Sequence, residues 1–206
     1  MSAMKRDWDV LLIGGSAGTG KTTLAKQLSD HYNIRVKQVD DIRLAMQEEM
    51  DPKEYPDLFA FIQGDEDFFK QPHDMLAEAL LKIGEDVWAE LEKVIEKHLD
   101  SPVIIEGDGI IPELLHAIPQ ENIRAIFLYD DQEQLKQRER ERKEKRGEKI
   151  DGRPDVVTDE WLERYTGVSY QFGQKIKSQA EKYGYPAIRS SPIETLLTRT
   201  LSLLNN

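Results

Sequence analysis

Residues 15–22 read Gly-Ser-Ala-Gly-Thr-Gly-Lys-Thr and satisfy the pattern G-x-x-x-x-G-K-[ST]. Glycines let successive backbone N–H groups turn toward phosphate oxygens, so this stretch predicts a phosphate-binding loop. We expect Lys21 to reach the β- and γ-phosphate oxygens of ATP, and the Thr22 hydroxyl to hold Mg²⁺. The residues expected to contact the nucleotide here are Gly15, Ser16, Ala17, Gly18, Thr19, Gly20, Lys21, Thr22 and Thr23.

The sequence on either side of the loop fits this interpretation. An apolar run, Val-Leu-Leu-Ile at 10–13, precedes the loop and predicts a buried strand. Residues 23–28 continue as a helix, whose N-terminus attracts anions. A dinucleotide-binding fingerprint is excluded, because Thr23 stands where G-x-G-x-x-G requires a third glycine.

Five short apolar runs predict the strands of one parallel sheet, at residues 10–14, 36–39, 103–105, 125–128 and 187–188. Helical stretches separate them. This alternation predicts an α/β fold of three layers, α/β/α, with helices on both faces of a five-stranded sheet. Ligands bind such sheets beyond the carboxyl ends of the strands, so the residues that follow each strand are the first candidates for function.

The composition limits the class of protein. At 206 residues, the chain suits a single domain over 1–206, with a helical acceptor-side insertion at about 41–102 and a lid at about 136–160. The absence of cysteine excludes disulfides, thiolate catalysis and cysteine metal sites. The N-terminus lacks the apolar segment of a secretory signal and no long apolar stretch occurs, so we expect a cytoplasmic protein without a membrane partner.

Charge is distributed unevenly along the chain. The net charge is −11, which disfavours a protein that grips nucleic acid. Residues 136–149, however, contain eight Lys or Arg and four Asp or Glu. The sequence therefore predicts one local basic site on an acidic molecule.

The predicted insertion contains an amphipathic helix, with apolar residues spaced by three and four at Leu76, Leu80, Ile83, Val87, Leu91 and Val94. Gly84 lies within this helix and either kinks it or admits a close neighbour. An aromatic group precedes the helix at Phe59, Phe61, Phe68 and Phe69. These rings either belong to the core or line an acceptor pocket.

Asp40-Asp41-Ile42-Arg43 directly follows the second strand. Phosphoryl transfer to an alcohol needs a carboxylate that takes or orients the hydroxyl proton, and we assign that role to Asp40, with Asp41 beside it. Arg43 could hold a carboxylate or phosphate of the acceptor. The alternative is that one aspartate caps a helix and Arg43 is solvated.

Glu106-Gly107-Asp108-Gly109 ends the third strand. Glu106 at this position could orient a Mg²⁺-bound water, and Asp108 could contact the acceptor. The alternative is a plain acidic turn, since Asp-Gly is common in turns.

Arg138 and Arg142 follow the fourth strand and share one face of a predicted helix, with Lys145 and Arg146 nearby. A lid that carries these arginines could close over the phosphates and stabilise transition-state charge. The alternative is a solvated helix with i, i+4 pairs between Glu139 and Lys143 and between Glu141 and Lys145.

Taken together, the loop, the acidic run and the arginine segment make most of the chain resemble the small P-loop kinases of the adenylate, shikimate and gluconate kinase type. That resemblance implies the P-loop NTPase fold, and it implies that Asp40 acts as general base. The run Val-Asp-Asp-Ile-Arg also resembles polynucleotide kinases and zeta-toxin-like kinases. Residues 104–112 are most similar to 2-phosphoglycerate kinase-like proteins.

The same resemblance extends to the predicted lid. The lid pattern Leu-x-x-Arg-x-x-x-Arg falls on Leu135, Arg138 and Arg142, and Arg189 follows the last strand, where related kinases surround the adenine. The chain departs from the family in two respects. It has no four-cysteine lid, and its insertion shows no nucleoside-monophosphate signature.

These observations predict an ATP- and Mg²⁺-dependent kinase that phosphorylates a small molecule, with the hydroxyl of an anionic metabolite as acceptor. A polynucleotide 5'-kinase is the second enzyme hypothesis, favoured by the acidic run and opposed by the net charge. A nucleotide-dependent switch or accessory ATPase, acting through a protein partner, is the hypothesis from a different class.

Overall fold

The computed structural model describes residues 6–99, 101–119, 121–146 and 158–205, with the backbone alone for 143–146. Five parallel strands form one sheet in the order β2-β3-β1-β4-β5. The strands are β1 (Val10–Gly15), β2 (Arg35–Gln38), β3 (Val103–Glu106), β4 (Ile123–Tyr129) and β5 (Ala187–Arg189). The predicted five-stranded parallel sheet is confirmed, and the second strand ends one residue earlier than expected because Val39 already begins a helix.

The helices are α1 (Lys21–Tyr32), α2 (Val39–Glu49), α3 (Ala60–Gln63), α4 (Glu66–Phe69), α5 (His73–Glu96), α6 (Pro112–His116), α7 (Gln132–Arg146), α8 (Asp159–Lys182) and α9 (Leu196–Leu204), with a 3₁₀ turn η1 (Ile193–Thr195) before α9. The predicted amphipathic helix is therefore longer at both ends. At Gly84 a Cβ would lie 2.6 Å from Ile111 Cδ1, so this glycine admits a close neighbour.

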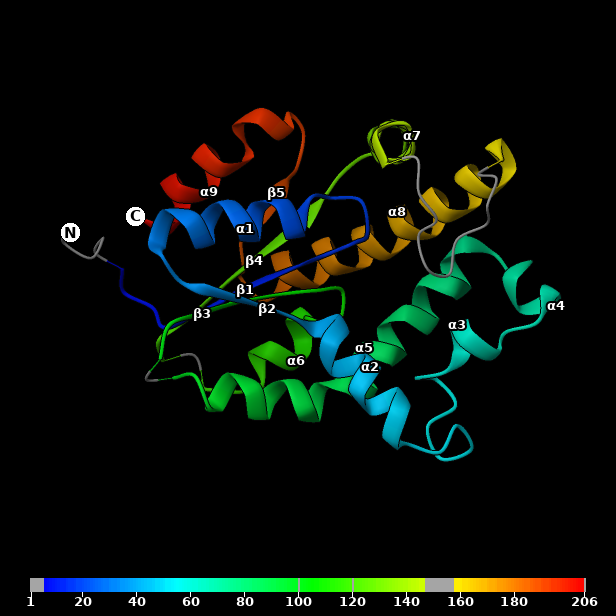
Figure 1. The fold of residues 1–206 in the computed structure, drawn as a ribbon, viewed down its shortest axis with the longest axis horizontal. Helices are drawn as coiled ribbons and strands as arrows, with labels where there is room; N and C mark the ends of the chain where they lie inside the picture. The colour runs from blue at the N-terminus through cyan, green and yellow to red at the C-terminus, as the bar shows by residue number, and fades with distance from the viewer. Residues whose placement is uncertain (1–5, 100, 120, 147–157, 206) are drawn as a thin grey trace.

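Helices cover both faces of the sheet (Figure 1). Alternate residues of the buried strand β1 point to opposite faces, because side chains alternate along a strand. Leu11 and Ile13 pack with α1 and α9, whereas Val10 and Leu12 pack with α2, α5, α6 and α8. Two apolar cores thus hold the three layers together and fix the carboxyl edge of the sheet.

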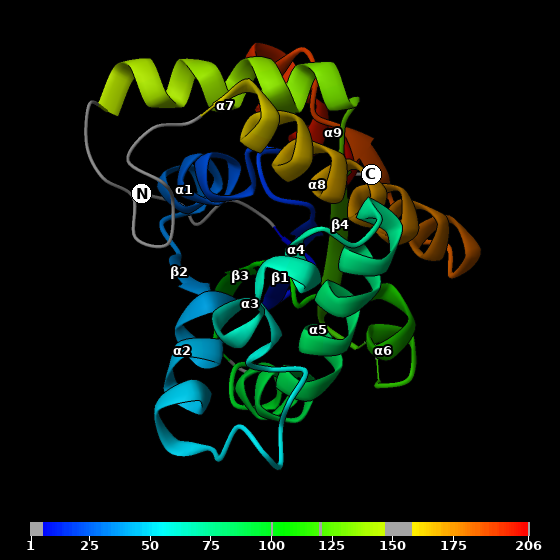
Figure 2. The ribbon, with the colours of Figure 1, turned by 90° about the vertical axis from the view of Figure 1, so that its right-hand side faces the viewer.

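Further helices lie beyond the carboxyl edge of the sheet. Figure 2 shows α7 lying across α8, with the short helices α3 and α4 beside α5. Residues 147–157 of the predicted lid, 136–160, lie outside the described residues. In the part of the chain that the structure describes, no helix has the length and apolar character needed to cross a membrane.

Candidate active site

The phosphate-binding loop connects β1 to α1 with glycines in left-handed conformations. Gly15, Gly18 and Gly20 have φ values of 126°, 79° and 88°, which residues with a Cβ rarely adopt. Gly20 precedes α1 and no side chain caps this helix, so its first N–H groups can receive an anion. Gly18, Gly20, Lys21, Thr22 and Thr23 line a cavity of about 280 Å³, which we call the phosphate cavity.

The other loop residues stabilise the turn. Ser16 and Thr19 are fully buried. The Ser16 carbonyl accepts hydrogen bonds from Thr19 Oγ1 at 2.7 Å and from Lys21 Nζ at 2.9 Å. The Ser16 and Thr19 side chains do not line the phosphate cavity, and contact of these two residues with the nucleotide stays a prediction.

Lys21 lies at the centre of the site. Its Nζ forms an ion pair with Asp108 Oδ1 at 2.5 Å, and its side chain is 9% exposed. Asp108 thus holds the ammonium group at the wall of the phosphate cavity, which both residues line.

Thr22 and Glu106, the two residues predicted to serve Mg²⁺, contact each other. Thr22 Oγ1 donates a hydrogen bond of 2.9 Å to Glu106 Oε1. Burial raises the pKa of Glu106, against the opposing effects of Lys21 and the Thr22 hydrogen bond. Among the described residues no three His, Cys, Asp or Glu gather as a metal site. Mg²⁺ keeps several waters and needs only one or two protein oxygens beside substrate phosphates, so this pair of oxygen donors fits it.

Asp40 and Asp41 lie in the first turn of α2, and neither caps it, since Gln38 is the N-cap and offers no side-chain bond. The capping alternative is therefore wrong. Asp40 Oδ1 pairs with Arg43 at 3.0 Å, and both line the phosphate cavity, whereas Asp41 does not. Although 56% of its side chain is exposed to solvent, desolvation by the surrounding protein raises the pKa of Asp40. Asp108 and Asp41 also raise it, while Arg43 and Lys21 oppose the rise.

A second and larger cavity of about 630 Å³ adjoins the first, and we call it the acceptor cavity. Ala17, Arg43, Asp108 and Tyr165 line both cavities. The remaining walls come from α3, α4, α5 and α8: Phe61, Phe69, Leu76, Leu80, Trp161, Arg164, Val168 and Ser169. The two cavities therefore meet beside Lys21.

The aromatic group of the sequence divides between core and cavity. Phe59 is 6% exposed and belongs to the core. Phe61 and Phe69 line the acceptor cavity, and Phe68 packs edge-on against both. The core interpretation thus holds for Phe59, whereas the binding of an acceptor beside Phe61 and Phe69 stays a prediction.

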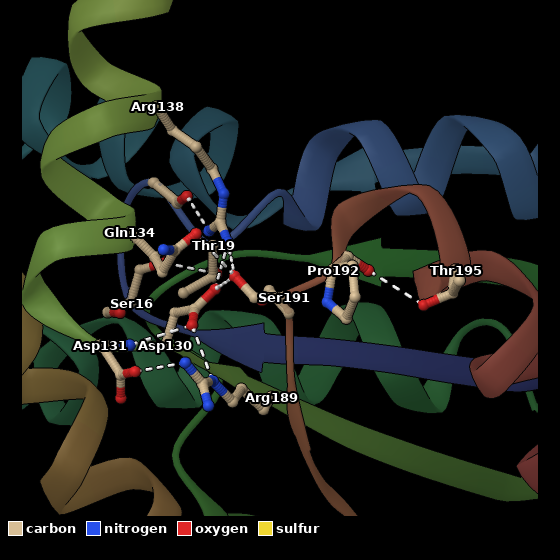
Figure 3. Close-up of polar contacts among 12 residues, drawn as sticks. Ser16, Thr19, Asp130, Asp131, Gln134, Arg138, Arg189, Ser191, Pro192 and Thr195 are labelled. Carbon is tan, nitrogen blue, oxygen red and sulfur yellow. Dashed lines mark hydrogen bonds and ion pairs between the residues drawn. The ribbon is translucent and has the colours of Figure 1, made fainter.

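Asp130 forms a polar cluster with residues from three elements (Figure 3). Its side chain is fully buried after β4 and accepts hydrogen bonds from Ser191 Oγ at 2.6 Å, from Arg138 and from Arg189 Nε at 3.2 Å. Burial acts to raise the pKa of Asp130, but the Ser191 and Arg138 hydrogen bonds outweigh it and hold the pKa below its ordinary value. This cluster ties β4, α7 and the residues after β5 together.

The two predicted lid arginines have different surroundings. Arg138 Nη1 donates to the Gly18 carbonyl at 3.0 Å, so Arg138 links Asp130 to the phosphate-binding loop. Arg142 lines the phosphate cavity and pairs with Glu139 at 3.4 Å. The side chains of Lys143, Lys145 and Arg146 lie outside the described residues. Arg189, predicted to lie near the nucleotide, is held by Asp130 and Asp131 and lines neither cavity.

The structure thus gathers Lys21, Thr22, Asp40, Arg43, Glu106, Asp108 and Arg142 around one cavity, and it leaves Asp41, Arg138 and Arg189 outside the walls of that cavity. Sequence reasoning missed Asp130, which follows a strand just as Asp40 does, so the same signal could have found it. It also missed Arg164 and Tyr165, because nothing in the sequence of α8 distinguishes residues that face a cavity.

Solved structures share this architecture. A gluconokinase from Sinorhizobium meliloti 1021 superimposes with a TM-score of 0.52 at 13% identity, covering 98% of this chain and 94% of that one. A shikimate kinase from Acinetobacter baumannii, in complex with shikimate, gives a TM-score of 0.54 at 15% identity, covering 97% and 94%. The chain has the P-loop kinase fold. At these identities the likeness shows the fold alone.

Two further comparisons gave no match. No protein-family model matches the chain, and no curated protein matches its sequence. The fold assignment therefore rests on structural similarity, and the chemistry is inferred from the residues of the site.

Proposed function

We propose that this protein is an ATP- and Mg²⁺-dependent phosphotransferase that phosphorylates a hydroxyl group of a small molecule. One observation carries the proposal: a phosphate cavity and an acceptor cavity meet at Ala17, Arg43, Asp108 and Tyr165, beside Lys21. A donor phosphate and an acceptor hydroxyl bound in the two cavities would face each other at this junction. Such an arrangement lowers the barrier by holding the reacting groups in line.

The donor side supplies positive charge around the phosphates. The N–H groups of the loop and of the first turn of α1 would bind phosphate oxygens. The Lys21 ammonium group would exchange its ion pair with Asp108 for contacts with these oxygens. Arg142, which lines the same cavity, would offset charge on the transferring group. Bound Mg²⁺ supplies further charge neutralisation, and Thr22 and Glu106 are the residues that would hold it or its water.

The proposed base is a carboxylate that lines the phosphate cavity and pairs with Arg43, a residue of both cavities. The reaction forms a bond between the acceptor oxygen and the γ-phosphorus, breaks the bond from that phosphorus to the β–γ bridging oxygen, and releases the hydroxyl proton. We assign this proton to Asp40, because its carboxylate lines the phosphate cavity, whereas Asp41 lies outside it. The raised pKa of Asp40 makes it a stronger proton acceptor than an ordinary aspartate.

The proposal is tested by ADP release from ATP and Mg²⁺ in the presence of hydroxylated metabolites. ATP consumption should be slow alone and should rise with a compound that fits the acceptor cavity, with one phosphorylated product formed per ADP. Consumption that no compound accelerates, together with a protein partner bound differently in the ATP and ADP states, would identify a nucleotide-dependent switch instead.

A further inference from the structure

The walls of the acceptor cavity are largely aromatic and aliphatic. Trp161 and Tyr165 lie one turn apart on α8 with their rings stacked, 4.8 Å between centroids and 9° between planes. Phe61 and Phe69 contribute two more rings, and Leu76, Leu80 and Val168 complete the apolar lining. A polyol would leave many of its hydroxyls without partners against such walls, which is costly, whereas a flat apolar group would pack well.

Arg164, a cation in the wall of this cavity, has no carboxylate partner among the residues that the structure describes. Its Nη2 donates to the Gln71 carbonyl at 2.6 Å, and among the described residues no Asp or Glu lies within ion-pair distance of it. The other charged residues of the lining are already paired, Arg43 with Asp40 and Asp108 with Lys21. Arginine stays ionised in proteins, and a guanidinium in partly apolar surroundings is stabilised by an anion.

The position of Arg164 determines how an anionic molecule would be oriented in the acceptor cavity. Arg164 lines the acceptor cavity alone, whereas Arg43 and Asp108 line both cavities. An anionic group on Arg164 would therefore lie in the part of the acceptor cavity that the phosphate cavity does not share. The other end of the molecule would reach the junction at Arg43 and Asp108, where Asp40 pairs with Arg43.

We propose that the acceptor is a hydroxylated anion with a flat apolar body, whose carboxylate or phosphate binds Arg164 and whose body packs against Phe61, Phe69 and Trp161. The hydroxyl then points to the junction. As the description of an acceptor, this rests on the phosphotransferase function proposed above. As the description of a ligand, it is tested without ATP.

Three probes separate the contributions of ring and charge. 3-(Hydroxymethyl)benzoate carries both, 3-(hydroxymethyl)benzamide keeps the ring and loses the charge, and gluconate keeps the charge on a polyol. We expect the full-length protein to bind the benzoate at least about tenfold more tightly than the benzamide by calorimetry, the loss expected for one charge-assisted hydrogen bond. Gluconate should bind more weakly than the benzoate. Equal affinity for acid and amide, tighter binding of gluconate, or no binding of either aromatic compound would overturn the inference.

Two variants locate the ligand. Arg164→Gln should abolish the difference between acid and amide, whereas Phe69→Ser should weaken both aromatic probes equally. Arg124→Gln is a matched control, because it removes the same charge at the start of β4, far from the carboxyl edge of the sheet. An Arg164→Gln protein that keeps the acid preference would also overturn the inference, and the wild-type comparison decides it if this variant does not fold. Formation of a phosphorylated product from ATP, measured separately, distinguishes failure of the phosphotransferase proposal from failure of this one.

Discussion

The phosphate cavity and the acceptor cavity are built in contrasting ways. Apart from Arg142 and Tyr165, the residues that line the phosphate cavity come from short segments at the ends of β1, β2 and β3, and polar contacts such as Thr22 to Glu106 connect these segments. The acceptor cavity is formed by side chains of α3, α4, α5 and α8, and most of them are apolar. The first is encoded in contiguous motifs, whereas the second exists only after distant helices pack. This difference explains why the sequence predicts a site for the phosphate donor but does not predict the chemical class of the acceptor.

Asp40→Asn should have the largest effect, because it removes the proposed base, whose partner Arg43 lines both cavities. We expect the rate of phosphotransfer to fall by about 10²- to 10⁴-fold with ATP affinity nearly unchanged. Calorimetry with an ATP analogue and single-turnover kinetics measure the two quantities. Asp41→Asn, which alters the exposed neighbour, is the control, and the assignment is wrong if that variant alone loses activity.

Lys21→Ala should impair the phosphate cavity directly. Turnover should fall by roughly 10²- to 10³-fold, as for removal of one group that stabilises transition-state charge. ATP affinity should fall as well, which distinguishes this variant from Asp40→Asn. The matched control is Lys26→Ala, an exposed lysine further along α1. Unchanged binding and turnover in Lys21→Ala would exclude the phosphate-binding role of the loop.

The rate of phosphotransfer should depend on pH through the ionisation of Asp40. Asp40 must be ionised to accept a proton, and its pKa lies above its ordinary value of 3.8, so the rate of the chemical step should fall as the pH drops through that raised pKa. This acid limb should be absent from the residual activity of Asp40→Asn. Persistence of the same limb in the variant would assign it to another group.

Asp130→Asn should act on stability, since Asp130 supports the phosphate-binding loop without lining either cavity. Loss of its charge-assisted hydrogen bonds should lower the free energy of unfolding by roughly 2 kcal/mol in urea denaturation. Because the folded-state pKa of Asp130 is depressed below 3.8, its contribution is present above that pH and is lost as the pH falls through the folded pKa. Asp131→Asn, at a partly exposed carboxylate, should cost less, and an equal loss would contradict the role of the buried cluster.

The smallest expected effect is a change in the fluorescence of Trp161 when an ATP analogue binds. Trp161 lines the acceptor cavity and stacks on Tyr165, which lines both cavities, so an ATP analogue should change its fluorescence through that contact. Subtracting the spectrum of Trp161→Phe removes the emission of the buried Trp8 and Trp88. A silent Trp161 with the analogue bound would show that the two cavities are not coupled here.

The sheet and the loop were predictable because their signals are local. An apolar run followed by glycines and a lysine determines strand, turn and helix within about twenty residues, as the Walker-type pattern requires. The carboxyl-edge rule then predicted that Asp40, Glu106 and Asp108 would lie together, and all three line the phosphate cavity.

The remaining features depend on contacts between distant segments. Asp130 meets Arg138 and Ser191 only after β4, α7 and β5 have packed, so the sequence did not show that Arg138 would be held against Gly18. The helices α3 and α4 have four residues each, too few for periodicity to indicate which faces are buried. The lid boundaries remain a prediction, because residues 147–157 lie outside the described residues.

Transfer of label from ATP to a small molecule tests the account most directly. Wild-type protein is incubated with Mg²⁺, ATP labelled in its γ-phosphate and a mixture of hydroxylated metabolites that includes aromatic acids. We predict that the label appears on a phosphorylated small molecule, and that Asp40→Asn binds ATP but transfers the label at least about 10²-fold more slowly. Label released only as inorganic phosphate, at a rate that the mixture leaves unchanged, would contradict the account.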